Sequence, residues 1–324
     1  MPKRDNILKQ SLDKNSMGLL HAQYGSYFTK DVLFEIFANK NKFYHYTTID
    51  GFKGIIESNG LWLSEAKYLN DKEEIINGKN KAIEVINFLM KTKKKYKIFS
   101  DILNGAIEKL NSLDFSNNYI CSFSLKFDDL DQWRAYGKNG SGICIEFTRD
   151  KEKYTLFEIF NFMQFAKVIY NDKEKYIILH RIIFIYFYYY CFDLKKGNYI
   201  DKEDYINFLV SSLSHNFILF KNQAFQSEKE IRLIYTGDPI KSFTKKSFRI
   251  SNNIIVPFIN LADSKITDGQ TNKLLAQEQK LPITKICIGP ISNQEAIIEA
   301  SIKEFLEFYG YSKDIVIRST IPYR

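Results

Sequence analysis

Cysteine and histidine are both scarce in this chain, with four of each among 324 residues. The cysteines lie far apart, at Cys121, Cys144, Cys191 and Cys287, and no Cys-x-x-Cys pair occurs. This spacing indicates neither a structural zinc site nor a disulfide framework, so we expect no metal. The N-terminal residues Met-Pro-Lys-Arg-Asp continue into polar sequence rather than an apolar signal core. Both features predict a chain that works in the reduced cytoplasm.

Long apolar runs and proline-rich linkers are also missing. The chain has six prolines, and its longest apolar run, Ile182 to Phe192, has eleven residues. At a helical rise of about 1.5 Å per residue, such a run cannot cross a hydrocarbon layer of about 30 Å. We therefore expect no membrane association, and we interpret the run as a buried helix or as a surface for a partner protein.

Aromatic and basic residues are abundant. The chain contains 27 Phe and 21 Tyr, is 45% hydrophobic, and carries 46 Lys and Arg against 38 Asp and Glu, for a net charge of +8. A chain of this length buries a sizeable core. Its charge favours approach to a polyanion or an anionic nucleotide. The lysine runs at 93–95 and 245–246 are interpreted as solvated faces, with a binding surface as the alternative.

Hydrophobic periodicity predicts an α+β fold. Predicted strands cover 43–48, 61–64, 119–124, 142–147, 168–170, 230–235, 250–258, 285–288 and 315–317. Predicted helices cover 70–90, 128–136, most of 151–218 and 294–309, with a further helix between Asp50 as N-cap and Asn59. The predicted parts are a helical N-terminal extension (1–40), the first half of a core (41–150), a mainly helical, aromatic-rich insertion (151–218) and the second half of the core (219–324).

Glu228 and Glu230 stand at the beginning of the strand predicted for 230–235. Residues two apart on a strand point to the same face, so both carboxylates can enter one site. Like charges held this close raise each other's proton affinity, which chemistry can use. The alternative is a solvated Glu-Lys-Glu loop. Arg232 shares the strand face of Glu230 and is expected to pair with a carboxylate.

The glycine-rich segment 137–142 resembles a phosphate loop only in composition. A phosphate loop follows a strand and precedes a helix N-terminus. This segment runs from a predicted helix into a predicted strand. We therefore expect it to be a turn.

Five further residues stand out by their positions. His45 lies on a predicted strand, Ser122 and Ser124 lie at the end of another, and Trp133 and Tyr136 lie on the helix that follows it. Each has a structural alternative. For His45 it is a strand histidine with a satisfied hydrogen bond, for Ser124 a turn, and for the two rings packing in the core.

The whole pattern resembles a large bacterial domain family of unknown function. Its marks in this chain are Tyr44-His45-Tyr46-Thr47, Asn70-Asp71 with Glu74, Phe123-Ser124, Trp133-x-x-Tyr136, Gly142, Tyr170, Glu228-x-Glu230-x-Arg232 and Ile288-Gly289-Pro290. The resemblance runs from residue 43 to residue 290, apart from much of 171–218. That family in turn distantly resembles ADP-ribosyltransferases of the His-Tyr-Glu kind, with members among toxin and phage-defence effectors.

The resemblance implies an ADP-ribosyltransferase-like split β core and NAD as the substrate. His45 would hold ribose hydroxyls, and the backbone of Tyr46 would meet the carboxamide. Tyr136 would stack on nicotinamide, with Trp133 as its neighbour or substitute. Ser124 would lie in the same NAD site.

The same resemblance implies roles for the acidic pair. Glu230 would stabilise the positive charge that develops at the ribose when the nicotinamide bond breaks. Glu228 would orient or deprotonate the acceptor. Arg232 would border the NAD site and hold the acidic pair in place.

The implied function is that of an NAD-dependent, ADP-ribosyltransferase-like intracellular effector of toxin or anti-phage type. Its acceptor would be a nucleic acid or a protein, and a neighbouring antitoxin would neutralise a toxic chain. One alternative is an NAD glycohydrolase that transfers ADP-ribose to water. The other is a non-catalytic module whose basic surface and aromatic side chains bind nucleic acid or a protein.

Overall fold

A computed structural model describes most of the chain. The described residues are 42–68, 72–114, 116–148, 163–236, 245–251, 253–263, 280–291 and 295–323. The described residues form two compact units. The helical unit comprises 76–113 and 172–218, and the sheet unit comprises the described residues of 42–75, 114–171 and 219–324. The N-terminal extension predicted at 1–40 and the Asn70-Asp71 mark lie outside the described residues.

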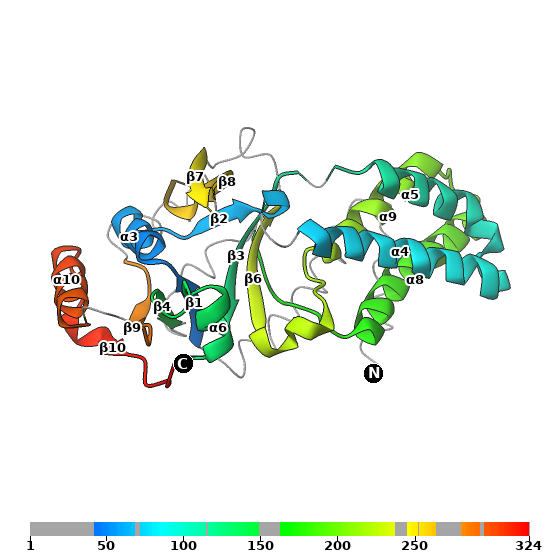
Figure 1. Ribbon diagram of the computed structural model, residues 1–324. Helices are drawn as coiled ribbons and strands as arrows, with labels where there is room; N and C mark the ends of the chain where they lie inside the picture. Colours follow the sequence, from blue (N-terminus) through cyan, green and yellow to red (C-terminus); the bar gives the residue numbers. More distant parts are fainter. Residues whose placement is uncertain are drawn as a thin grey trace, which may run out of the picture. The chain divides into compact units, whose positions relative to one another are not determined.

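The sheet unit is built on a ten-stranded mixed sheet (Figure 1). The strands are β1 (Lys42–Thr47), β2 (Trp62–Glu65), β3 (Asn118–Ser124), β4 (Ile143–Thr148), β5 (Met163–Lys167), β6 (Glu230–Thr236), β7 (Lys246–Ser251), β8 (Ile254–Asn260), β9 (Ile283–Ile288) and β10 (Val316–Arg318). Eight of them follow the order β10-β9-β4-β1-β3-β2-β8-β7, while β6 pairs with β3 and β5. β9 and β10 are parallel, and the other described pairs are antiparallel. The predicted combination of helices with a sheet is confirmed.

One edge of β3 is divided between two strands. β6 pairs along the opposite edge, from Asn118 to Ser124. On the divided edge, β1 pairs with Ser124 at one end of β3, and β2 pairs with Tyr119 and Ile120 at the other. The sheet is therefore split beside β3, because β1 leads into β4 and β9 whereas β2 leads into β8 and β7.

Over the described residues, the sheet unit contains three helices and four short 3-10 helices. They are α3 (Ile49–Ser58), α6 (Leu130–Ala135), α10 (Glu295–Phe308), η1 (Ala66–Tyr68), η3 (Gln223–Glu228), η4 (Leu261–Asp263) and η6 (Lys313–Ile315). The predicted N-cap of α3, Asp50, is wrong. Thr48 caps the helix, since its hydroxyl accepts from the N–H of Gly51 at 3.1 Å, and Asp50 lies in the first turn.

Two local predictions concern the turns of the sheet unit. The single strand predicted for 250–258 is wrong, because it is the hairpin of β7 and β8, with Asn253 at a φ of 61° in its turn. The predicted turn at 137–142 is confirmed, and it leads from α6 into β4. A Cβ on Gly142 would lie 2.3 Å from the carbonyl oxygen of Thr47, so the close approach of β1 requires glycine there.

Over the described residues, the helical unit contains four helices, labelled in Figure 1, and one 3-10 helix. They are α4 (Lys72–Thr92), η2 (Lys94–Phe99), α5 (Ser100–Ser112), α8 (Asp172–Lys196) and α9 (Lys202–Phe217). α5 packs closely on α9, because a Cβ on Gly105 would lie 2.4 Å from Cδ1 of Ile206. This packing places 76–113 with 172–218, whereas the sequence pattern placed 76–113 in the first half of the core.

The apolar run at Ile182 to Phe192 lies inside α8. Five of its side chains are buried: Ile182, Ile183, Tyr186, Tyr189 and Tyr190. The Tyr186 hydroxyl also lies 2.8 Å from Oγ of Ser212 on α9. By length and composition alone, α8 as a whole is long and apolar enough to cross a membrane, although core helices meet the same criterion. Its packing on α9 buries part of the run, while Phe184 and Tyr188 remain 39% and 46% exposed.

Candidate active site

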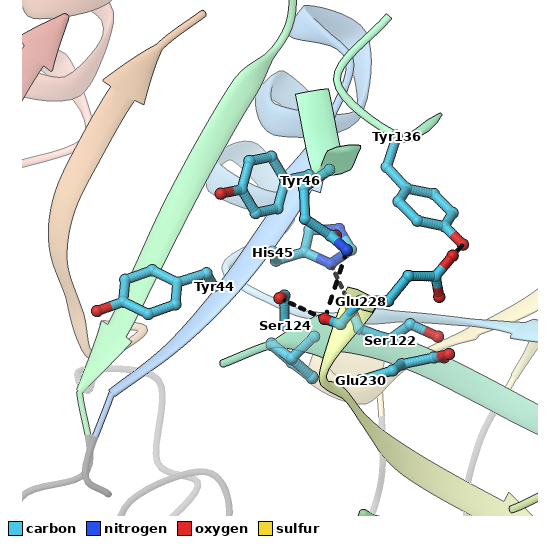
Figure 2. Close-up of a pocket in the computed structure, with 10 residues that line it drawn as sticks. Tyr44, His45, Tyr46, Ser122, Ser124, Tyr136, Glu228 and Glu230 are labelled. Carbon is cyan, nitrogen blue, oxygen red and sulfur yellow. Dashed lines mark hydrogen bonds between the residues drawn. The ribbon is translucent and has the colours of Figure 1, made fainter. Parts of the chain in front are cut away.

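A pocket of about 380 Å³, counting the open space at its mouth, lies where β1 and the beginning of β6 meet the end of β3 (Figure 2). It is lined by Tyr44, His45, Tyr46, Ser122, Phe123, Ser124, Gln132, Tyr136, Glu228 and Glu230. Six of the eight predicted site residues are among them. Trp133 and Arg232 are not, because both side chains are completely buried.

His45 contributes a neutral imidazole to the pocket. Its Nδ1 lies 2.9 Å from the carbonyl oxygen of Ser122. A carbonyl oxygen only accepts, so Nδ1 carries the proton and Nε2 is an acceptor. Burial lowers the pKa of His45 below its ordinary 6.5, although the Ser122 carbonyl opposes this. The ring is thus a strand histidine with a satisfied hydrogen bond that still offers an acceptor to a hydroxyl group.

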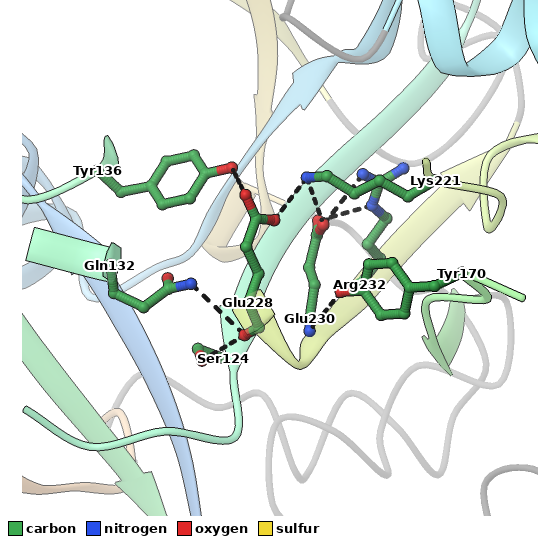
Figure 3. A network of polar contacts seen from close by, with 8 residues as sticks. All are labelled: Ser124, Gln132, Tyr136, Tyr170, Lys221, Glu228, Glu230 and Arg232. Atoms are coloured by element: carbon green, nitrogen blue, oxygen red, sulfur yellow. Dashed lines mark hydrogen bonds and ion pairs between the residues drawn. The ribbon is translucent and has the colours of Figure 1, made fainter. Parts of the chain in front are cut away.

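The main chain at Glu228 is held by two buried polar side chains. Oγ of Ser124 donates to the Glu228 carbonyl oxygen at 2.7 Å, and Nε2 of Gln132 donates to the same oxygen at 3.4 Å (Figure 3). Glu228 is the last residue of η3, and Lys229 adopts a left-handed φ of 48°. The predicted position of Glu228 on a strand is therefore wrong, since β6 begins at Glu230. A turn, rather than a shared strand face, brings the two carboxylates together.

The Glu228 carboxylate is buried between a phenol and an ammonium group. The Tyr136 hydroxyl donates to Oε1 at 3.0 Å, and Nζ of Lys221 lies 2.7 Å from Oε2 (Figure 3). Tyr136 itself is 41% exposed, so one part of its ring is available to a ligand. The carboxylate and the ring that lines the pocket are therefore fixed to each other.

Glu230 has both carboxylate oxygens in ion pairs. Nε of Arg232 lies 2.7 Å from Oε1, Nη2 lies 3.2 Å from Oε2, and Nζ of Lys221 lies 2.9 Å from Oε2. Burial would raise the pKa of Glu230, but Arg232 and Lys221 lower it to about 2. The predicted rise in proton affinity from the neighbouring Glu228 is therefore wrong for Glu230. The predicted pairing of Arg232 with a carboxylate is confirmed.

Lys221 joins the two carboxylates and was not predicted from the sequence. Its side chain is 4% exposed and contacts both Glu228 and Glu230. The signal in the sequence was the position of this lysine directly after the apolar residues 217–220. A lysine buried there would need an acidic partner, since an isolated lysine is rarely buried. Tyr170, a mark of the family without an assigned role, accepts from the N–H of Glu230 at 2.9 Å and so holds the beginning of β6.

The stability of the sheet unit is expected to fall as the pH drops from about 4.5 toward 2. Glu230 binds a proton at about pH 2 in the folded chain but near its ordinary pKa of 4.5 in the unfolded chain. The linked stabilisation of roughly 3 kcal/mol is complete above pH 4.5 and is lost as the pH falls through the folded pKa. Urea unfolding across this range measures it. Glu230→Gln should flatten the profile, and Glu57→Gln, at an exposed ion pair on α3, should leave it unchanged.

Trp133 and Tyr46 build the wall behind the pocket. Their rings meet edge to face with centroids 4.9 Å apart, in a cluster with Cys144 and Cys287. Nε1 of Trp133 donates to Oδ1 of Asp128 at 2.8 Å. The buried position of Trp133 agrees with the core-packing alternative, and its ring is not available to stack on a ligand. The Tyr46 hydroxyl donates to the Lys126 carbonyl oxygen at 3.0 Å.

Within the described parts of the chain, no group of three or more His, Cys, Asp or Glu side chains is arranged to hold a metal ion. The four buried groups of the acidic cluster, Lys221, Glu228, Glu230 and Arg232, have balanced formal charges. Their arrangement can place a fixed negative charge beside the ring of Tyr136. Such a charge can stabilise a developing cation.

Comparison with known proteins supports the family resemblance. The model of a family described as "Protein of unknown function (DUF2971)" matches residues 132–233. The matched segment contains Gln132, Tyr136, Tyr170, Lys221 and the Glu228-to-Arg232 mark. The predicted resemblance to a domain family of unknown function is confirmed over this segment, which does not include His45 or Ser124. No curated protein and no solved structure gives a significant match to the chain.

Proposed function

We propose that the chain is an NAD-dependent ADP-ribosyltransferase whose pocket binds the nicotinamide and its ribose. One observation carries the proposal. His45, Ser124, Tyr136 and the pair Glu228 and Glu230 come from distant parts of the sequence and line one pocket. The divided edge of β3 also supports it, because the resemblance to the transferases implies a split β core.

In the proposed reaction, the bond between the ribose C1′ and the nicotinamide nitrogen breaks, and nicotinamide leaves with the bonding electron pair. The acceptor's nucleophilic atom then forms a bond to C1′ and loses its proton to water. His45 would accept a hydrogen bond from a ribose hydroxyl through Nε2. The exposed part of the Tyr136 ring would stack on nicotinamide.

The contacts of the two carboxylates favour different catalytic roles from the ones that the resemblance implies. Two cations already neutralise Glu230, whose pKa of about 2 also makes it a weak base. Glu228 shares a single ammonium group with Glu230 and is hydrogen bonded to Tyr136, the ring proposed to stack on nicotinamide. We therefore assign the developing ribose charge to Glu228. Glu230, with Arg232, holds Lys221 in place.

The acceptor in this proposal is a nucleic acid or a protein, as expected of an intracellular effector of toxin or anti-phage type. The NAD glycohydrolase alternative uses the same pocket and the same bond cleavage, with water in place of the macromolecule. Its distinguishing product is free ADP-ribose. An antitoxin remains a proposed partner.

Tyr136→Ala is expected to lower kcat/KM for nicotinamide release by about 5- to 150-fold, because stacking on an aromatic ring contributes roughly 1–3 kcal/mol. The experiment incubates the whole protein with NAD labelled in the adenylate part and a cell extract. Released nicotinamide and labelled macromolecules are then measured. Tyr199→Ala is the matched control, because Tyr199 is 90% exposed on the helical unit.

The outcomes separate the hypotheses. Nicotinamide release with a labelled macromolecule supports the transferase. Release with only free ADP-ribose supports the glycohydrolase, and an absence of release at any NAD concentration overturns both. Equal kcat/KM in the Tyr136 and Tyr199 variants would remove the stacking role of Tyr136.

A further inference from the structure

A row of aromatic rings lies along α8 in the helical unit. Tyr176, His180 and Phe184 are four residues apart, which places them on one face of the helix. Their centroids are 5.8 and 6.3 Å apart, and successive rings are inclined by only 6° and 22°. Phe184 is 39% exposed, and the other two rings are partly exposed. The row therefore presents partly exposed aromatic side chains to solvent.

A cluster of lysines accompanies the row of rings. The segment 91–97 contains Lys91, Lys93, Lys94, Lys95 and Lys97 and no acidic residue, and all five lysines are exposed. Within the described part of the chain, none of them forms an ion pair with an acidic side chain. The positive charge of this segment is therefore not neutralised locally.

The lysine segment and the row of rings form one surface. Nζ of Lys95 lies 4.7 Å from the centroid of the Phe184 ring and 5.7 Å from that of Phe187. Burial lowers the pKa of His180, and the nearby charges of Lys95 and Lys93 lower it further. Phe88, which is 47% exposed, extends the surface from α4 by packing edge-on against Tyr176 at 6.2 Å.

We propose that this surface of the helical unit binds single-stranded nucleic acid. The unpaired bases would stack on the exposed parts of the Phe184 and Tyr176 rings, and the lysines of 91–97 would contact phosphates. Flat, nearly parallel rings beside unneutralised lysines match both parts of a nucleotide chain. A duplex offers only its phosphates to such a surface, because its bases are already stacked on one another. The inference is independent of the proposed reaction with NAD.

The test measures binding of the full-length protein to a fluorescent 20-nucleotide oligothymidylate and to a 20-base-pair duplex by fluorescence anisotropy. The single strand is expected to bind at least about 10-fold more tightly. Phe184→Ala should weaken its binding by about 5- to 150-fold through lost stacking. Tyr199→Ala is the aromatic control, because this ring is 90% exposed and lies outside the row. It should leave binding unchanged.

The lysine contribution is tested through salt dependence. Lys94→Gln with Lys95→Gln should reduce the slope of log K against log salt concentration by about 1.4, since each lost phosphate contact on a single strand contributes about 0.7. Lys195→Gln with Lys196→Gln removes the same charge at the far end of α8 and should leave the slope unchanged.

Three results would overturn the proposal. The first is equal affinity for duplex and single strand. The second is equal binding by the Phe184 and Tyr199 variants. The third is binding to vesicles of anionic phospholipid without binding to the oligonucleotide, which would identify the surface as a membrane contact.

Discussion

Glu228→Gln is expected to lower the rate of nicotinamide release from NAD by about 100- to 1,000-fold, because it removes a fixed charge placed to stabilise the transition state. Glutamine keeps the size of the side chain and can still accept from the Tyr136 hydroxyl. Lys221 keeps its second carboxylate, Glu230, at 2.9 Å. The substitution leaves Lys221 and Arg232 with one buried carboxylate, so a loss of stability is also expected, and the rates are compared where each variant is folded. The measurement is the single-turnover rate of nicotinamide release at saturating NAD, with Tm recorded for each variant.

Glu57→Gln is the matched control for this substitution. It makes the same chemical change at an exposed ion pair with Lys53 on α3 and should leave the rate unchanged. One result would exchange the roles assigned to Glu228 and Glu230. If Glu228→Gln releases nicotinamide at the normal rate but no longer labels an acceptor, the ribose charge belongs to Glu230 and Glu228 serves the acceptor, as the sequence resemblance implies.

Arg232→Met is expected to lower the free energy of unfolding of the sheet unit by about 3–5 kcal/mol, because it leaves the buried Glu230 with one cation in place of two. Urea unfolding measures this loss. Arg318→Met is a close control, since Nε of Arg318 lies at the same 2.7 Å from Glu299 but in a pair of which each side chain is about 30% exposed. An exposed pair contributes about 0–1 kcal/mol.

The double variant Glu230→Gln with Arg232→Met tests the cause of the loss. If an uncompensated buried charge is responsible, the double variant should be more stable than Arg232→Met alone. A loss equal to the sum of the two single losses would mean that packing, rather than charge, determines the cost. Glu230→Gln also leaves Arg232 buried with less negative charge beside it. A loss of activity in that variant would therefore include a loss of stability.

The elements that position the site were largely predictable. β1, β3, β4 and α6 lie within a few residues of their predicted bounds, because alternation, helical spacing and turn residues act between close neighbours in the chain. Predictions were wrong where the same local sequence pattern fits two different structures. The segment 250–258 contains a turn at Asn253, which tolerates a left-handed φ, and strand periodicity does not reveal such a turn.

Some functional residues were likewise predicted from the sequence, and others were not. His45, Ser124, Tyr136 and the acidic pair were identified by residue type and order along the chain, and they line one pocket. Lys221 and Gln132 were missed, since neither follows a motif and both acquire their roles through contact with Glu228. Trp133 has the residue type and spacing of a stacking ring, but its ring packs against Tyr46 in the core.

By itself, the sequence determined the class of fold, the strands and helices around the pocket, and the residue types that gather there. These properties follow from interactions between residues close in the chain. Only the tertiary structure decided that a turn at Lys229 joins the two carboxylates, that Lys221 and Arg232 neutralise Glu230, and that Glu228 meets Tyr136. Those contacts link a turn, the end of a short helix and the beginning of a strand. They depend on the packing of the sheet, because ion pairs and hydrogen bonds need their atoms within about 3 Å in three dimensions.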